Sequence, residues 1–495
     1  MNGSALSAML GWDVRLQRRY GFYLVYTVLT VAFVLGLRLV PPELRTDAAV
    51  LLVVTDPTVL GFYFVAAMVL FEKGEGVLDA LVTTPLGDRG YLLSKVCSLS
   101  LLAVVASTLV AVLGHGSVPG LGVLVVGVAL ASSLFVLVGF VAVARFDSVN
   151  AYFIAAVGWG TVLFLPLFGY VGLVDTPLFY LLPVQPVLVL VEGGFRPLTL
   201  AELAYGVGYL LVANGVAYRW ARRSFRRHIV RGGDPGRHLV GATRSATART
   251  ARGAARSPAV GLALADLRNW LRDPMLVVAA AGPLVLAVFV RVGAPTVAAL
   301  ARPLVALPPY YPLLVGGLAV LGPSIYGFVV GMFVLEDREQ GVLTAYRTSP
   351  LSARGYLGYR AATAYVLAFA ATLPALVVVG LVPVSPAVLV GTVAVAALGA
   401  PVIALAFGTL AANTIEGLAL GKLLNLVVLG PVLALVVLPE PVQLLLGVFP
   451  AYWPVKALVA AQAGDPTWPL FLVAGLVAHL LALAGLARWF ARRAD

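Results

Sequence analysis

Two short charged segments contain the residues of this chain that are best suited to chemistry or to polar recognition. They are FEKGEGVLDALVTTPLGDRGYLLSK, residues 71–95, and LEDREQGVLTAYRTSPLSARGYLGYR, residues 335–360. Each begins with glutamates, which could act as a general acid and base or could contact a charged partner. No nucleophile or metal-ligand cluster accompanies them, and the 4 histidines are scattered along the chain. Acid–base catalysis is therefore disfavoured.

The two segments match each other in a fixed order. A one-residue insertion at Gln340 aligns Glu72 with Glu336 and Glu75 with Glu339. After this point the match has no gap, and the identical pairs include Gly76/Gly341, Thr83/Thr348, Pro85/Pro350, Leu86/Leu351, Arg89/Arg354, Gly90/Gly355 and Tyr91/Tyr356. A mixed polar run rarely repeats by chance, so the pattern indicates a duplicated chain.

The composition predicts a membrane protein. Hydrophobic residues make up 61% of the chain and charged residues 11%, whereas a soluble domain is about 25% charged. The single cysteine, Cys97, excludes a disulfide framework. No G-x-x-x-x-G-K-[ST] motif is present, so we expect neither a cofactor nor ATP hydrolysis in this chain.

Hydropathy predicts an all-α integral membrane protein with about 12 transmembrane helices of about 20 residues each. An amphipathic helix over residues 4–20 should lie in the membrane interface before the first span. Proline-interrupted stretches at 175–199 and 439–465 should form outer re-entrant or interfacial hairpins. The predicted spans are 22–40, 50–71, 91–113, 121–144, 151–174, 200–220, 275–292, 311–335, 356–381, 386–411, 418–438 and 469–490.

These spans divide into two halves, 1–221 and 257–495, joined by an arginine-rich linker over 222–256. The linker is too polar to bury a core. It is either a disordered cytoplasmic strap or a tether to anionic lipid. An even number of spans in each half gives both halves the same orientation, so the repeat should be parallel.

The basic residues predict which side of the membrane each loop faces. Most of the 34 Lys and Arg, including those of both charged segments and the linker, fall on one side. By the positive-inside rule this side, with both termini, is cytoplasmic. The net charge of +12 thus reflects membrane topology, and no nucleic-acid partner is expected. The exceptions are Arg38, Arg45, Arg196, Arg291, Arg302 and Lys456.

This topology can be tested by cysteine labelling in intact cells. In a Cys97→Ala background, an impermeant maleimide should label cysteines introduced at Pro119, Glu192 and Asp465, which are predicted to be external. Cysteines at Arg237 and Asp495 should label only after the cells are permeabilised. Labelling of position 237 in intact cells would contradict the topology.

The charged segment, with E-x-x-E, G-V-L and T-[TS]-P-L-x-x-R-G-Y-L, resembles the coupling segment of ABC-2-type permeases, the membrane subunits of ATP-driven exporters. The resemblance extends over the plan of the chain, although many such permeases are single six-span halves that pair as dimers. It implies a separate ATPase, in two copies, that binds ATP and magnesium. It also implies that the coupling segment contains Glu72, Glu75, Gly76, Pro85, Arg89, Glu336, Glu339, Gly341, Pro350 and Arg354.

The resulting function is export of an unidentified substrate, and the apolar spans favour a lipophilic one. An ion-coupled secondary transporter and a non-transporting membrane scaffold are the alternatives. Few ionisable residues fall inside the spans, which disfavours ion coupling. Reversing the charge of Glu72 with Glu75, or of Glu336 with Glu339, should leave membrane insertion intact because we expect these groups to be exposed. It should instead weaken assembly with the ATPase or uncouple ATP hydrolysis from transport.

Overall fold

The structure is a computed structural model that describes residues 3–56, 58–78, 84, 86–146, 152, 156, 163–172, 176–227, 274–301, 306–339, 341 and 352–494. Its chain divides into two compact units, Met1–Ala246 and Thr247–Asp495. The described regular elements are all helical. Eleven described helical segments are long and apolar enough to cross a membrane. They confirm eleven of the predicted spans, whereas the span predicted at 151–174 lies mainly outside the described residues.

The first unit is built around α4 (Leu60–Gly74), which with α3 (Pro42–Thr55) forms the most buried span among those described there. Around it lie α2 (Phe22–Leu39), α6 (Gly87–Leu109) with its π-helical extension Val110–His115, and α7 (Leu121–Val143). The outermost span is α11 (Leu200–Phe225), which has the smallest buried share. A helix with so little of its surface buried inside the protein is expected to face lipid with apolar side chains.

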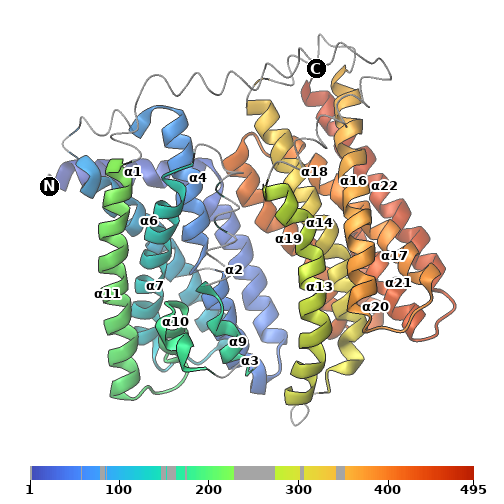
Figure 1. Ribbon diagram of the computed structural model, residues 1–495, viewed down its shortest axis with the longest axis horizontal. Helices are drawn as coiled ribbons and strands as arrows, with labels where there is room; N and C mark the ends of the chain where they lie inside the picture. Colours follow the sequence, from blue (N-terminus) through green and yellow to red (C-terminus); the bar gives the residue numbers. More distant parts are fainter. Residues whose placement is uncertain are drawn as a thin grey trace. The chain divides into compact units, whose positions relative to one another are not determined.

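Short helices lie at the two ends of the first unit. Figure 1 shows α1 (Gly3–Arg19) crossing the long helices at one end, as expected of an interfacial helix. At the other end, the residues predicted to form a proline-interrupted hairpin form a 3₁₀ turn (Pro177–Leu181) and α10 (Val184–Glu192), near the short α9 (Pro166–Tyr170). The predicted interfacial helix and the predicted proline-interrupted hairpin therefore lie at opposite ends of the first unit.

A polar network joins α10 to the start of α11. The Thr199 hydroxyl caps the helix by accepting from the Glu202 backbone N–H at 3.2 Å, and Glu202 accepts in return from the Thr199 N–H at 2.8 Å. Arg196 donates to Glu192 at 2.8 Å and to Glu202 at 3.0 Å. Hydrogen bonds to these two carboxylates raise the pKa of Arg196, so the guanidinium stays charged.

The start of α7 packs directly against the turn that follows α10. The Gly120 N–H donates to the Gly194 carbonyl at 3.0 Å. A Cβ atom at Gly120 would lie 2.0 Å from the Gly193 carbonyl oxygen. Only glycine lets the two backbones approach this closely.

The second unit also contains one largely buried span and one span with little burial. Its most buried described span is formed mainly by α14 (Tyr311–Glu339), and its least buried is α22 (Trp468–Ala494). Between them in sequence lie α16 (Ser352–Val379), α17 (Pro386–Ala397), α18 (Gly399–Leu410) and α19 (Thr414–Val437). The predicted hairpin at 439–465 contains α20 (Glu440–Gln443), a 3₁₀ turn and α21 (Tyr452–Gln462).

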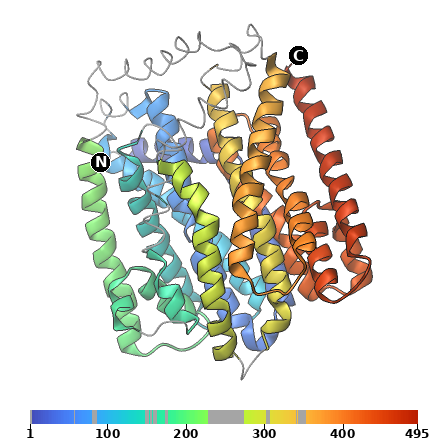
Figure 2. The same cartoon turned by 45° about the vertical axis from the view of Figure 1, so that its right-hand side comes forward.

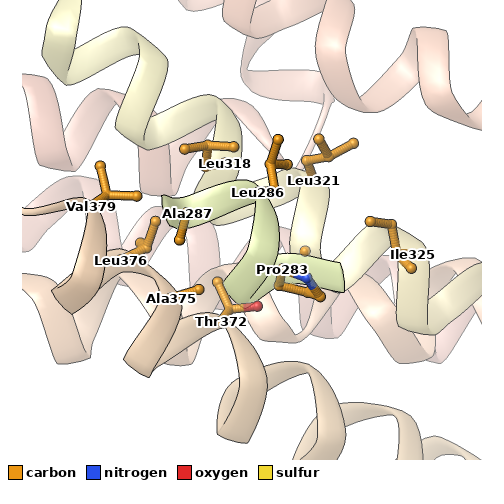
Figure 3. Close-up of a pocket in the computed structure, with 11 residues that line it drawn as sticks. Pro283, Leu286, Ala287, Leu318, Leu321, Ile325, Thr372, Ala375, Leu376 and Val379 are labelled. Carbon is orange, nitrogen blue, oxygen red and sulfur yellow. The ribbon is translucent and has the colours of Figure 1, made fainter. Parts of the chain in front are cut away.

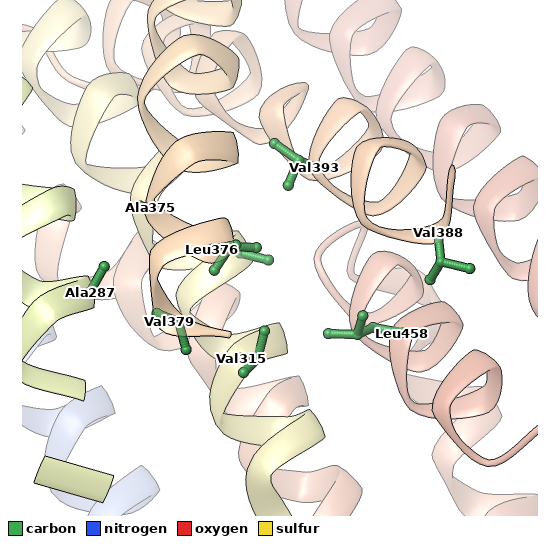
Figure 4. Packing of buried hydrophobic residues seen from close by; sticks show 9 residues of the cluster. Ala287, Val315, Ala375, Leu376, Val379, Val388, Val393 and Leu458 are labelled. Carbon is green, nitrogen blue, oxygen red and sulfur yellow. The ribbon is translucent and has the colours of Figure 1, made fainter. Parts of the chain in front are cut away.

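The core of the second unit contains small and branched aliphatic side chains. Figure 4 shows Ala287 of α13 (Pro274–Ala301) beside Ala375, Leu376 and Val379 of α16, with Val315 of α14. Figure 2 shows the long helices of this unit from a second direction, with α22 at its edge. Small residues at such contacts let membrane helices pack closely.

Candidate functional site

Three helices of the first unit meet at a buried charged cluster. The Lys95 Nζ atom of α6 lies 2.5 Å from Asp13 Oδ1 of α1 and 2.5 Å from Glu72 Oε1 of α4. All three side chains are at most 1% exposed. The remaining carboxylate oxygens also accept hydrogen bonds, from the Tyr91 hydroxyl to Glu72 at 2.6 Å and from the Ser94 hydroxyl to Asp13. Every carboxylate oxygen therefore has a donor, as a stable buried ionic cluster requires.

Helical spacing explains why these groups converge. Tyr91, Ser94 and Lys95 are separated by three and four positions in α6, which places them on one face. Asp13 and Gln17 are similarly four positions apart in α1. The Gln17 amide donates to the Ser98 hydroxyl at 3.0 Å, so α1 is joined to α6 over a further turn. This contact fixes the interfacial helix to the span that follows the charged segment.

A similar cluster lies at the corresponding place in the second unit. The Arg360 guanidinium of α16 lies 2.7 Å from Asp337 Oδ2 of α14, and the Tyr356 hydroxyl donates to the same carboxylate oxygen. The sequence separations between acid and tyrosine (19) and between acid and base (23) are the same in both units. Asp13-Val14-Arg15 has a sequence counterpart in Asp266-Leu267-Arg268, which lies outside the described residues.

These spacings correct the alignment of the two charged segments. Glu72 corresponds to Asp337 rather than to Glu336, so the insertion at Gln340 is wrong. A second pair of contacts agrees with this correction, because Lys73 donates to the Phe146 carbonyl and Arg338 to the Ala411 carbonyl, each across 73 residues. The predicted partner, Glu336, is half-buried.

The predicted glutamates lie in different environments. Glu72 is fully buried, so the expectation that its charge could be reversed at little cost is wrong. Glu75 is exposed just beyond the end of α4. Glu339 accepts from the Thr414 backbone N–H at 2.6 Å and from its hydroxyl at 2.8 Å, and therefore satisfies donors at the start of α19.

The two glycines turn the chain out of its long helices. Gly76 and Gly341 have φ angles of 67° and 70°, a left-handed conformation that strongly favours glycine. Arg89 is exposed near the start of α6. The neighbouring Asp88 binds Arg222 at 3.1 Å and Arg226 at 2.8 Å, which ties α6 to the end of α11.

Other predicted site residues lie outside the described part of the structure. These are Pro85, Pro350 and the Arg354 side chain. Most of residues 77–81 and all of residues 342–346, two runs whose sequences are compatible with short helices, lie there as well. Arg354 belongs by its backbone to α16. Among the described residues, no group of three or more His, Cys, Asp or Glu could hold a metal ion.

Sequence reasoning missed Asp13 and Lys95 as functional residues. Asp13 lies 81 residues from Ser94 and 82 from Lys95, with α2, α3 and α4 between them in the sequence. A signal was nevertheless present, because both charged segments continue with a tyrosine and, four positions later, a base: Tyr91/Lys95 and Tyr356/Arg360. A base at the start of an otherwise apolar span needs an acidic partner nearby.

Comparisons with known proteins match the two parts of the chain separately. Residues 4–232 match the fluoroquinolones export permease protein family, and residues 266–487 match the family described as fluoroquinolones export permease protein Rv2686c-like. The fluoroquinolones export permease protein Rv2687c of Mycobacterium tuberculosis strain H37Rv is 36% identical over 193 residues, covering 38% of this chain and 81% of the relative. Rv2686c of the same strain is 33% identical over 105 residues, covering 21% of this chain and 42% of the relative. No solved structure matches the chain significantly.

Proposed function

Because the chain belongs to the fluoroquinolones export permease family, we propose that it is the membrane subunit of an ABC-2-type exporter driven by a separate ATPase. The chain is a multi-pass membrane protein with many apolar helices. Its similarity to export permeases supports a role in moving a substrate across the membrane. Fluoroquinolones, or other amphipathic aromatic compounds, are the proposed substrate class.

The two family matches occupy consecutive, non-overlapping parts of the chain. This supports a tandem arrangement of two permease halves in one polypeptide. The equal spacing of the acid, tyrosine and base in the two clusters supports the same proposal. The proposed complex contains one such chain and two copies of the ATPase, which binds ATP and magnesium.

The observation that carries the ATPase proposal is the arrangement at the ends of α4 and α14. In each unit an acid–tyrosine–base cluster anchors the helix, and a positive-φ glycine follows within a few residues. Because the buried contacts resist displacement, a helix anchored in this way can transmit a force from the ATPase without bending. Glu75 lies exposed beside this anchor and is the proposed charged contact for the ATPase, on the cytoplasmic side with both chain termini.

The test uses inside-out membrane vesicles from cells that produce the chain with the ATPase that copurifies with it. These vesicles should take up a fluoroquinolone only when ATP is supplied. Glu75→Lys should lower this uptake by about tenfold or more, because a lost charged contact of about 2 kcal/mol has that effect. The matched control is Glu43→Lys, at an exposed glutamate of α3, which should transport as the wild type does.

The alternatives give different results in the same vesicles. The buried Asp13–Glu72–Lys95 cluster is an observation in favour of ion coupling, because buried ionisable groups in membrane proteins often form ion or proton pathways. Uptake driven by a proton gradient without ATP or the ATPase would establish a secondary transporter and overturn the proposal. A scaffold would bind the ATPase but give no uptake under either condition.

A further inference from the structure

The first unit has a large apolar groove between α2 and α6. Its volume is about 740 Å³, and α1 lies at one end. The floor includes the buried side chains of Tyr26 and Ala106, while Val31, Leu101 and Val105 form exposed parts of its walls. Ligand pockets commonly have volumes of about 300–1,000 Å³ and mostly apolar linings. This groove is therefore large enough for a drug-sized molecule.

One end of the groove is polar. There the Tyr23 hydroxyl donates to the Gln17 amide oxygen at 3.2 Å, and the Gln17 nitrogen donates to the Ser98 hydroxyl at 3.0 Å. Tyr23 and Ser98 line the groove, and Gln17 is buried behind them. A molecule lying in the groove would place its apolar body between α2 and α6 and a polar group at these hydroxyls. The lining thus complements an amphipathic molecule better than a purely hydrocarbon chain.

A much smaller cavity lies at the corresponding helix pair of the second unit. There α13 packs against α16, and the cavity between these helices and α14 has a volume of only about 20 Å³. Figure 3 shows Pro283 and Leu286 of α13 facing the same small space as Thr372 and Leu376 of α16. The groove of the first unit is therefore much larger than this cavity.

We propose that this groove binds the amphipathic aromatic substrate, with its polar substituent at Tyr23 and Ser98 and its ring system along α6. The inference rests on the proposed export function, and it adds the binding site. An aromatic body gains free energy from leaving water for an apolar surface. The two hydroxyls already donate to the Gln17 amide oxygen and to the Lys95 carbonyl, so their oxygens would accept a hydrogen bond from a donor on its polar group. The residues of this site all belong to the first unit.

The chain supplies its own reporter for this site. Cys97 is the single cysteine of the chain; it is exposed and lines the groove. N-ethylmaleimide should label it in the purified wild-type protein without any added substitution. A fluoroquinolone at about ten times its Kd should slow this labelling by about tenfold, since only the free fraction reacts.

Substitutions that fill the groove should remove this protection. Val105→Trp and Val31→Trp add bulk from opposite walls at positions that are 48% and 52% exposed, so the fold should tolerate them. The matched control is Val126→Trp on α7, at a position that is 46% exposed and does not line the groove. The fluoroquinolone should protect Cys97 in the wild type and in the control, but in neither groove variant.

Several outcomes would overturn the site. They are absence of labelling in the free protein, absence of protection in the wild type, equal protection in all variants, or protection by phospholipid but not by the fluoroquinolone. The measurement needs neither ATP nor the ATPase. Protection of Cys97 without ATP-driven uptake would therefore support the site and reject the proposed energy source. ATP-driven uptake without protection of Cys97 would support the energy source and reject the site.

Discussion

Lys95→Met is expected to lower the free energy of unfolding by about 3–5 kcal/mol, because it leaves two buried carboxylates without their shared cation. Lys95 is the base that contacts both Asp13 and Glu72 at 2.5 Å. Methionine has a similar length, so lost packing contributes little. The measurement is the thermal midpoint of the detergent-solubilised protein, monitored by circular dichroism and by loss of monodisperse protein.

Two variants identify the cause of this loss. Lys95→Arg should keep most of the stability, since Arg360 occupies the corresponding position of the second unit. Arg360→Met should cost less than Lys95→Met, because its side chain is 13% exposed and that of Asp337 is 23% exposed, which lets water screen the carboxylate. Equal thermal midpoints for Lys95→Met and the wild type would contradict a structural role for the buried cluster.

Gly120→Ala should also destabilise the first unit, by about 1–3 kcal/mol or more, as overpacking of a closely packed site does. The added Cβ would lie 2.0 Å from the Gly193 carbonyl oxygen. That atom belongs to the backbone and cannot rotate away. The start of α7 and the turn after α10 would therefore have to separate.

Gly122→Ala is the matched control two residues further along. A Cβ at Gly122 has no neighbouring heavy atom within 4 Å. Because alanine favours a helix by about 1 kcal/mol over glycine, this variant should be as stable as the wild type or more stable. The thermal midpoints of both variants test the prediction, and a similar change in the two would reject close packing at Gly120.

Hydropathy predicted the helices of this fold well because bilayer thickness sets their length and every backbone group must be paired within the helix. The described α2, α7, α16 and α22 all fall at predicted spans. The amphipathic pattern of residues 4–20 likewise predicted α1. These are local properties, which a single sequence expresses directly.

The buried cluster could not be predicted in the same way, because its members meet only after three helices have packed. Asp13 reads as one of several polar residues on an amphipathic helix, and Glu72 as part of a charged loop. The alignment of Glu72 with Glu336 gave more identical pairs between the two segments. In the structure, however, Glu72 and Asp337 are equivalent, because each contacts the base 23 residues later. The predicted role of Glu75 in ATPase coupling stays a prediction.

The first unit has Glu72 and Lys95 at the places where the second unit has Asp337 and Arg360. The acid of the second unit is one methylene shorter, and its base has a longer reach, so the pair still meets at 2.7 Å. The acid before each charged segment and the base after it therefore depend on one another, and a change of charge at either would have to be matched at the other.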